Sequence, residues 1–93
     1  MRTYELVCAF RVKEGQDVAG IEAVKKILAD NAATLKSEED MGDRELAYEI
    51  EKETRGRYRL FNVDLDQEKL PKIEEAFKLR TEILRYLFVV KGE

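Results

Sequence analysis

The length, composition and charge of the chain favour one small globular domain. Its 93 residues suffice for one hydrophobic core, whereas a second domain would bury too little surface, so we expect a single domain over residues 1–93. Hydrophobic residues make up 44% and charged residues 40%, which indicates a well-solvated surface rather than disorder. The net charge of −3 does not by itself indicate a nucleic-acid binder.

Several function classes are disfavoured by residues that the sequence lacks. Cys8 is the single cysteine and lies in an apolar run, which predicts a buried thiol, excludes an intramolecular disulfide and suits a reducing cytoplasm. No apolar stretch approaches 18 residues, so we expect a cytoplasmic protein without a membrane span. Histidine, cysteine clusters and glycine-rich phosphate loops are all absent. We therefore expect no catalysis, metal, cofactor or small-molecule substrate.

The first third of the chain predicts a strand followed by a helix. Apolar residues alternate from Thr3 to Val12 and occupy both faces, which is typical of a central strand. After a break at residues 13–15, apolar residues recur at helical spacing from Asp17 to Ala33. Asp17 suits the N-cap or the first turn of that helix, where a carboxylate meets unpaired backbone amides.

The middle of the chain predicts a β-hairpin. A polar stretch over residues 36–41 precedes a half-buried strand at residues 46–51. Thr54–Gly56 resembles a turn, and residues 57–65 return as the partner strand. The apolar pattern slips by one position between Leu60 and Phe61, which indicates either a bulge or burial on both faces.

The last third repeats the order of helix and strand. Residues 66–80 have helical spacing, with Pro71 tolerable only in the first turn, and residues 83–91 form a nearly continuous apolar strand. The order is therefore β-α-β-β-α-β. Because crossovers are right-handed, both helices lie on one face of the sheet. We expect an α+β, ferredoxin-like sandwich with a four-stranded antiparallel sheet.

Basic residues gather near the C-terminus of an otherwise acidic chain. Residues 77–91 hold Lys78, Arg80, Arg85 and Lys91 against one acidic residue, a net charge of +3. Arg85 stands out because its strand is otherwise apolar. These four side chains are candidates for a local contact with a polyanion such as RNA, and the alternative is an intramolecular partner such as Glu5.

Arginines also cluster around the predicted hairpin turn. Arg55, Arg57 and Arg59 flank Tyr58, and guanidinium groups pair with phosphates and stack on bases. We therefore consider Arg55 and Arg57 as RNA-binding candidates. The alternative is a charged turn whose arginines face acidic residues across the ladder, namely Glu45, Glu49 and Glu51.

A third candidate surface is apolar. Val7, Ala9, Leu87 and Val89 are expected on the sheet face away from the helices. An exposed patch of this size usually marks a contact with another protein. The alternatives are scattered surface residues or a homodimer face.

Three segments resemble motifs of one known family. Residues 1–7 are similar to its opening strand, MRxYE; residues 42–58 resemble its hairpin, GxRxLAYPIxK…GxY; and residues 83–91 resemble its closing strand, vLRyLvvr. Each motif alone is weak, but the three occur in the correct order over essentially the whole chain. The sequence thus resembles the family of bacterial 30S small-subunit ribosomal protein six.

The resemblance implies a structural protein that binds the central domain of 16S rRNA together with ribosomal protein eighteen. By position, it places Arg2, Lys78, Arg80 and Arg85 near RNA, and it places the apolar sheet face or its edges against the protein partner. A different hypothesis is a ferredoxin-like regulatory or small-ligand-binding module that self-associates through its open sheet face.

The sequence departs from the family pattern at two positions. Glu49 stands where the family usually has proline, which predicts the loss of an edge-strand irregularity. Asp43 occupies a position that is often basic, which predicts a weaker phosphate contact there.

Overall fold

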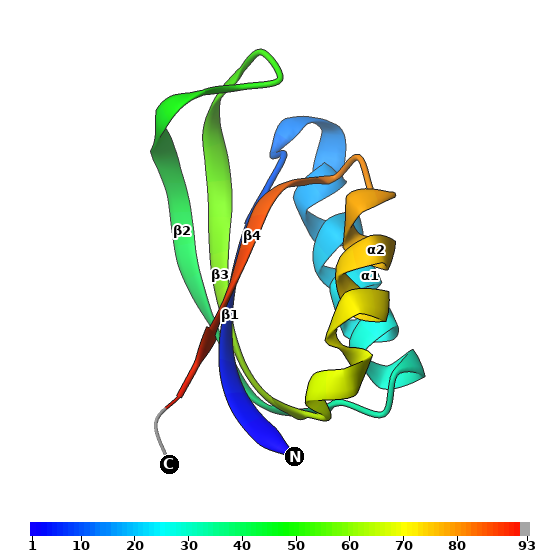
Figure 1. Ribbon diagram of the computed structural model, residues 1–93. Helices are drawn as coiled ribbons and strands as arrows, with labels where there is room; N and C mark the ends of the chain where they lie inside the picture. Colours follow the sequence, from blue (N-terminus) through cyan, green and yellow to red (C-terminus); the bar gives the residue numbers. More distant parts are fainter. Residues whose placement is uncertain (92–93) are drawn as a thin grey trace.

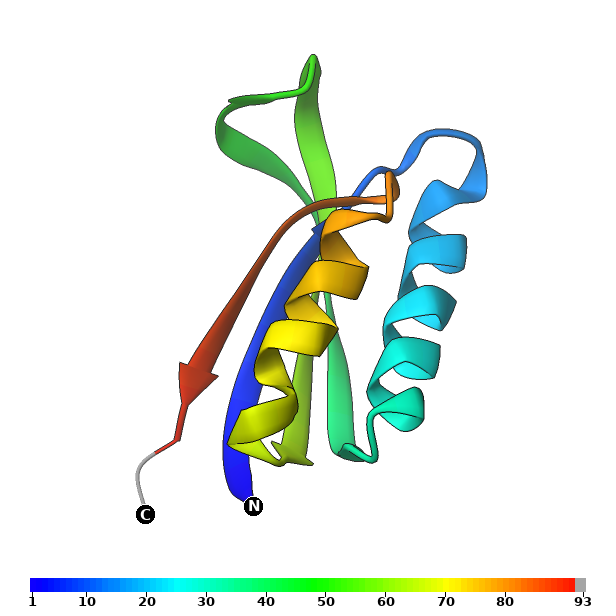
Figure 2. The same ribbon diagram turned by 45° about the vertical axis from the view of Figure 1, so that its right-hand side comes forward.

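The structure is a computed structural model that describes residues 1–91. Two helices lie side by side on one face of a four-stranded sheet (Figures 1 and 2). The elements are β1 (Arg2–Phe10), α1 (Gln16–Asp30), β2 (Thr34–Ile50), β3 (Glu53–Leu65), α2 (Leu70–Lys78) and β4 (Ile83–Val90). The strand order is β2-β3-β1-β4 and every pair is antiparallel. The predicted ferredoxin-like fold is confirmed.

The apolar core fills the space between the sheet and the helices. Its fully buried side chains come from β1, α1, β3 and α2, and Ile83 of β4 is buried to a slightly lesser extent. No polar or charged side chain is buried among the described residues. Cys8 lies in this core, as predicted, and burial raises the pKa of its thiol. Helix α1 approaches the sheet closely at Gly20, where an added Cβ would lie 2.5 Å from the Phe10 ring. The core members are Tyr4, Leu6, Cys8, Phe10, Ile21, Val24, Leu28, Phe61, Val63, Leu65, Ile73, Phe77 and Ile83.

The pairing of β1 tests two sequence predictions, namely that β1 is a central strand and that a bulge or two-sided burial explains the slip at Leu60 and Phe61. β1 lies between β3 and β4, so it is a central strand, as expected. Its register with β3 runs without a shift from Arg2↔Leu65 to Phe10↔Arg57. No bulge therefore separates Leu60 from Phe61. The two residues lie on opposite faces, and burial on both sides explains the slipped pattern.

The hairpin differs from its prediction. β2 begins at Thr34, so the polar stretch at residues 36–41 is strand, and the turn lies at Glu51–Lys52 instead of Thr54–Gly56. Both turn residues have positive φ, 48° and 69°, without the glycine or asparagine that usually marks such a turn. β2 is an edge strand, and charged side chains on such a strand discourage pairing with other chains. Its first half is therefore mostly charged and polar, and lacks the alternation of apolar residues that would have predicted a strand.

An irregularity persists in β2 despite the glutamate at position 49. The pairing with β3 jumps from Glu45↔Arg55 to Ile50↔Glu53. The prediction that Glu49 abolishes the irregularity is therefore wrong. β2 departs from the regular ladder in this stretch. Leu46 and Ile50 there pack in an apolar cluster with Ala9 of β1 and Leu84 of β4.

The helix ends agree with most of the sequence predictions. α1 begins at Gln16, so Asp17 lies in its first turn, and Gly15 at φ 76° occupies the N-cap. Pro71 lies in the first turn of α2, as predicted, but the helix ends at Lys78 and not at Arg80. Lys78 therefore stands at the C-terminal end of α2, close to the start of β4.

Candidate functional site

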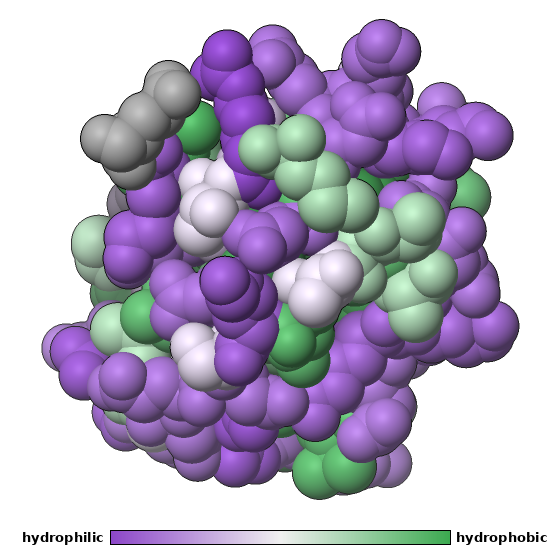
Figure 3. All heavy atoms as spheres, turned by 90° about the horizontal axis from the view of Figure 1, so that it is seen from below, coloured by the Kyte–Doolittle hydropathy of each residue, from purple (hydrophilic) through white to green (hydrophobic). Residues whose placement is uncertain are grey.

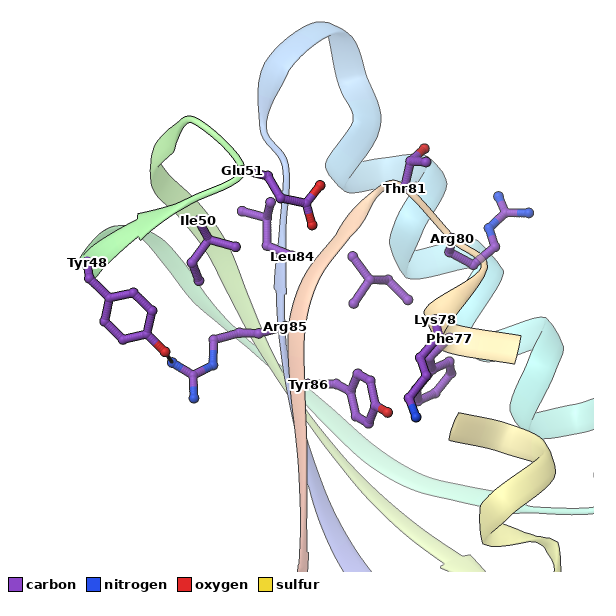
Figure 4. A pocket seen from close by; sticks show the side chains of 11 residues that line it. Tyr48, Ile50, Glu51, Phe77, Lys78, Arg80, Thr81, Leu84, Arg85 and Tyr86 are labelled. Atoms are coloured by element: carbon purple, nitrogen blue, oxygen red, sulfur yellow. Dashed lines mark hydrogen bonds between the residues drawn. The ribbon is translucent and has the colours of Figure 1, made fainter. Parts of the chain in front are cut away.

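A groove of about 560 Å³ lies where β4 begins. It separates the distal β2–β3 hairpin from the C-terminal end of α2, as Figure 4 shows. Residues 83–86 of β4 line it, and β4 is an edge strand with no neighbour on its outer side within the described chain. The remaining lining residues are Tyr48, Ile50, Glu51, Phe77, Lys78, Arg80 and Thr81.

The groove brings together three residues that the sequence singled out as basic. Arg80 donates to Glu82 through Nε at 3.2 Å and Nη2 at 3.0 Å, and its guanidinium group points away from the groove in Figure 4. Arg85 and Lys78 have no carboxylate partner among the described residues. Their two positive charges are therefore available to a ligand.

Arg85 is held by an aromatic residue instead of an acid. Its Nη1 donates to the Tyr48 hydroxyl at 3.3 Å, and its guanidinium carbon lies 5.9 Å from the Tyr48 ring centroid (Figure 4). This cation–π contact joins β2 to β4 without neutralising the arginine. The Tyr48 side chain is 62% exposed. Sequence reasoning missed Tyr48 as a site residue, although an aromatic side chain in a polar strand was an available signal.

Tyr86 supports the opposite wall of the groove. Its ring packs edge-on against Phe77, with centroids 5.4 Å apart, and its hydroxyl donates to Glu74 at 3.2 Å. Burial and this carboxylate raise the pKa of Tyr86. The Tyr86 ring is thus fixed by the core, whereas the Tyr48 ring is largely exposed to solvent.

The acidic residue in the groove is already neutralised. Glu51 forms an ion pair with Arg11, whose guanidinium group also donates to Glu53 at 3.0 Å and to the Thr81 carbonyl at 2.7 Å. These contacts fix the hairpin tip to the end of β1 and to the loop before β4. The free charge of the groove is therefore positive.

The hairpin arginines are engaged within the chain. Arg57 pairs with Asp40 through Nη2 at 2.7 Å and with Asp17 of α1 through Nη1 at 2.7 Å. Arg59 pairs with Glu38. The alternative to RNA binding expected these arginines to face acidic residues of the chain, and they do. The acidic partners, however, are not the expected Glu45, Glu49 and Glu51.

Hydrogen bonds from Arg57 lower the pKa of Asp40 to about 2 and also hold the pKa of Asp17 below its usual value. Lys25 contacts Glu38 at 2.8 Å, and together with Arg59 it lowers the pKa of that carboxyl. We call Asp17, Lys25, Glu38, Asp40, Arg57 and Arg59 the ion-pair network.

Three further predicted RNA residues lie outside the groove. Arg55 lies within β3 and forms an ion pair with Asp43 at 3.1 Å. Asp43, which departs from the family pattern, therefore has a basic partner within the chain. Lys91 pairs with Glu5 at 3.4 Å, beside the start of β1. Arg2 is exposed at that same end. Seen from below, this end of the molecule is mostly hydrophilic with small apolar patches (Figure 3).

The apolar sheet face is smaller than predicted. Leu87 and Val89 are 55% and 44% exposed, and Val7 lies directly opposite Leu87. Ala9 is only 1% exposed because Leu46, Leu84 and Tyr58 pack with it in a second apolar cluster. The expectation that Ala9 is exposed on this face is therefore wrong. The curve of β2 covers it.

The structure holds no group of metal-ligating side chains within residues 1–91. Over the same residues, none of its helices has the length and apolar character needed to cross a membrane.

Comparison with known proteins identifies a family. Residues 3–90 match the family model for ribosomal protein S6. Two curated relatives, both small ribosomal subunit protein bS6, come from Treponema denticola and Treponema pallidum strain Nichols. They are 52% and 40% identical over 96% of this chain and 96% of each relative.

Solved structures agree with this match. The crystal structure of 30S ribosomal protein S6 from Thermotoga maritima superposes with a TM-score of 0.86 at 28% identity, covering 97% of this chain and 87% of that one. The C-terminal domain of the Mycobacterium tuberculosis MgtC protein, at TM-score 0.67 and 11% identity over 98% of this chain and 88% of that one, shares the fold alone. The chain therefore belongs to the bacterial ribosomal protein S6 family, and it is a structural protein of the small ribosomal subunit in the cytoplasm, not an enzyme.

Proposed function

We propose that this chain binds the central domain of 16S rRNA together with ribosomal protein eighteen. The observation that carries the proposal is the groove at the start of β4. There Lys78 and Arg85 present charges that no acidic residue of the described chain neutralises. Such charges on an acidic protein suit a local contact with a polyanion. Family membership and the sequence resemblance supply the identity of the RNA and of the partner.

The chain is expected to bind RNA weakly without its partner. The net charge is −3, and the arginines of the hairpin are engaged in internal ion pairs. Affinity for RNA rises with the number of phosphates that a protein neutralises, and so does the salt dependence of binding. A groove with two free cations gives few such contacts. A second protein must therefore supply much of the affinity.

The partner surface that fits best is the accessible part of the open sheet face. Leu87 and Val89 are exposed there, on the edge strand β4 and near the groove. Apolar side chains beside an unpaired strand edge are a common basis for protein contacts. A protein bound at this place lies close enough to the groove to share an RNA ligand.

The direct test measures binding of the purified chain to a central-domain 16S rRNA fragment, with and without ribosomal protein eighteen, at two salt concentrations. We expect weak binding with a shallow salt slope for the chain alone and tight binding for the pair. Tight binding by the isolated chain, unchanged by the partner, would contradict the proposal.

Matched variants test the partner surface. Leu87→Ser should weaken association with ribosomal protein eighteen, because it removes an exposed apolar contact. Val18→Ser is the control, since Val18 is 58% exposed on α1, on the opposite side of the molecule. Equal effects of the two variants would remove the sheet face from the interface.

Self-association through the same apolar face is the competing interpretation. Sedimentation of the isolated chain at low concentration separates the two. We expect a monomer; a stable dimer that dissociates in the Leu87→Ser variant would favour self-association.

A further inference from the structure

We infer that the groove receives an unpaired nucleotide of RNA, with its base stacked on Tyr48 and its phosphates beside Lys78 and Arg85. The inference rests on the proposed function, and it goes beyond it by distinguishing an unpaired strand from a duplex.

Arg85 differs from most arginines of this chain because it has no acidic partner among the described residues. Most arginines are paired with acids in the structure, namely Arg11, Arg55, Arg57, Arg59 and Arg80. Arg85 instead rests on the neutral Tyr48 hydroxyl and ring. A guanidinium group that is held in place but keeps its charge can bind a phosphate through two hydrogen bonds. Such binding costs little side-chain conformational entropy, because the group is already ordered.

Tyr48 supplies the aromatic surface. Its ring is 62% exposed in an edge strand whose other outward residues are mostly charged or polar. The contact with Arg85 fixes the ring at the rim of the groove (Figure 4). Bases of single-stranded RNA stack on tyrosine, whereas bases in a duplex already stack on each other. An exposed, oriented tyrosine beside two free cations therefore favours an unpaired base.

The shape and floor of the groove agree with this ligand. Leu84, Ile50 and Phe77 give it an apolar floor, and the unpaired edge of β4 borders it. A duplex keeps its bases stacked inside the helix, so it cannot place a base on the aromatic rim of this hollow of about 560 Å³. A single nucleotide turned out of its strand can enter such a hollow.

The location of binding is tested first with simple probes. The isotope-labelled chain is titrated at low salt with a mixed-sequence single-stranded RNA of about ten nucleotides and, separately, with a hairpin duplex. We expect the single strand to bind at least about ten-fold more tightly and to shift the amide signals of residues 48 and 83–86. Equal affinity for the duplex, or shifts confined to the hairpin arginines, would overturn the inference.

The contribution of each side chain is tested in the complete complex with the rRNA fragment and ribosomal protein eighteen. Tyr48→Ala should lower RNA affinity about ten-fold, whereas Tyr48→Phe should retain most of it because stacking needs only the ring. Lys78→Gln should reduce the salt slope by about 0.7, the value for one contact with a single strand. Lys72→Gln is the control, since Lys72 is exposed on the same helix outside the groove.

These outcomes separate this inference from the proposed function. If the unmodified chain fails to bind the rRNA fragment even with its partner, the proposed function fails and the inference with it. If it binds, and Tyr48→Ala and Lys78→Gln bind equally well, the function stands and the groove inference is wrong. Weaker binding of ribosomal protein eighteen by Tyr48→Ala without RNA would assign the groove to the protein partner and also overturn the inference.

Discussion

The centre of the sheet and its β2 flank are held by different forces. Beneath the helices, β1 and β3 contribute fully buried apolar side chains, and no charged group is buried there among the described residues. At the flank, α1 meets β2 and β3 through the ion-pair network. Burial of apolar surface therefore specifies the fold, while charge pairing positions an edge strand that has little apolar surface to bury.

The geometry of α1 explains this division. Its inward stripe, including Val24 and Leu28, enters the core, while Asp17 and Lys25 reach over its side toward the hairpin. Opposite them, the positions of β2 are charged, for example Glu38 and Asp40. Exposed ion pairs typically contribute only about 0–1 kcal/mol each. Variants in the two regions should therefore differ clearly in their effects.

The largest effect is expected in the core. Phe61→Ala should lower the free energy of unfolding by about 3–5 kcal/mol, because it leaves a cavity under both helices. Urea denaturation measures it. The control is the neighbouring Leu60→Ala, which acts on the other face at a half-buried position and should cost clearly less. Similar losses for both variants would contradict the division between the faces.

A smaller effect is expected where α1 approaches β1. Gly20→Ala improves helix propensity, but its Cβ would lie 2.5 Å from the fully buried Phe10 ring. Overpacking of this kind costs about 1–3 kcal/mol, so we expect net destabilisation in thermal unfolding. A raised melting temperature for Gly20→Ala would show that the helix moves away from the sheet at little cost.

A still smaller effect is expected at the flank. Arg57→Met keeps much of the side-chain volume but removes the charge shared by Asp17 and Asp40. We expect a loss of about 1 kcal/mol in unfolding free energy at neutral pH. Faster amide hydrogen exchange in residues 38–43, with unchanged exchange in β1, would localise the effect to β2. A loss as large as that of Phe61→Ala would contradict our assignment of forces.

The pH dependence of stability tests the same network. The folded pKa of Asp40 is about 2 against an ordinary 3.8, and the pKa values of Asp17 and Glu38 are also lowered. Because these folded values lie below the unfolded ones, their stabilisation is complete above about pH 5 and is lost as the pH falls toward 2. The Arg57→Met variant should show a flatter decline over this window. Parallel pH profiles for the two proteins would rule out the arginine as the cause.

The sequence predicted the elements where one pattern dominates. The alternation in residues 3–10 and the helical stripe from Ile21 to Leu28 arise from burial against a single core, and both elements form as expected. Val18 has the spacing of that stripe but is exposed. The hairpin turn was misplaced because Glu51 and Lys52 adopt positive φ without the usual residues, while Arg55–Gly56 looks like a turn but lies in β3. Turn position there depends on the register of two long strands, which local chemistry does not reveal.

The candidate site shows the same limit. Lys78, Arg80 and Arg85 were found from local charge, and the structure brings them to one groove. Tyr48 was missed because it reaches the groove only through the irregular stretch between Glu45 and Ile50. The engagement of Arg57 with Asp17 joins positions 40 residues apart, so it needed the folded chain to become visible.

The most direct test of the central claim is the distribution of this protein in its native cells. Lysate is sedimented through a sucrose gradient in magnesium, and the chain is quantified in each fraction. We predict that it sediments with the small ribosomal subunit at about one copy per particle, and that a Leu87→Ser variant shifts toward the free fractions. A wild-type chain found only in the free fractions, as a monomer or dimer, would contradict the account.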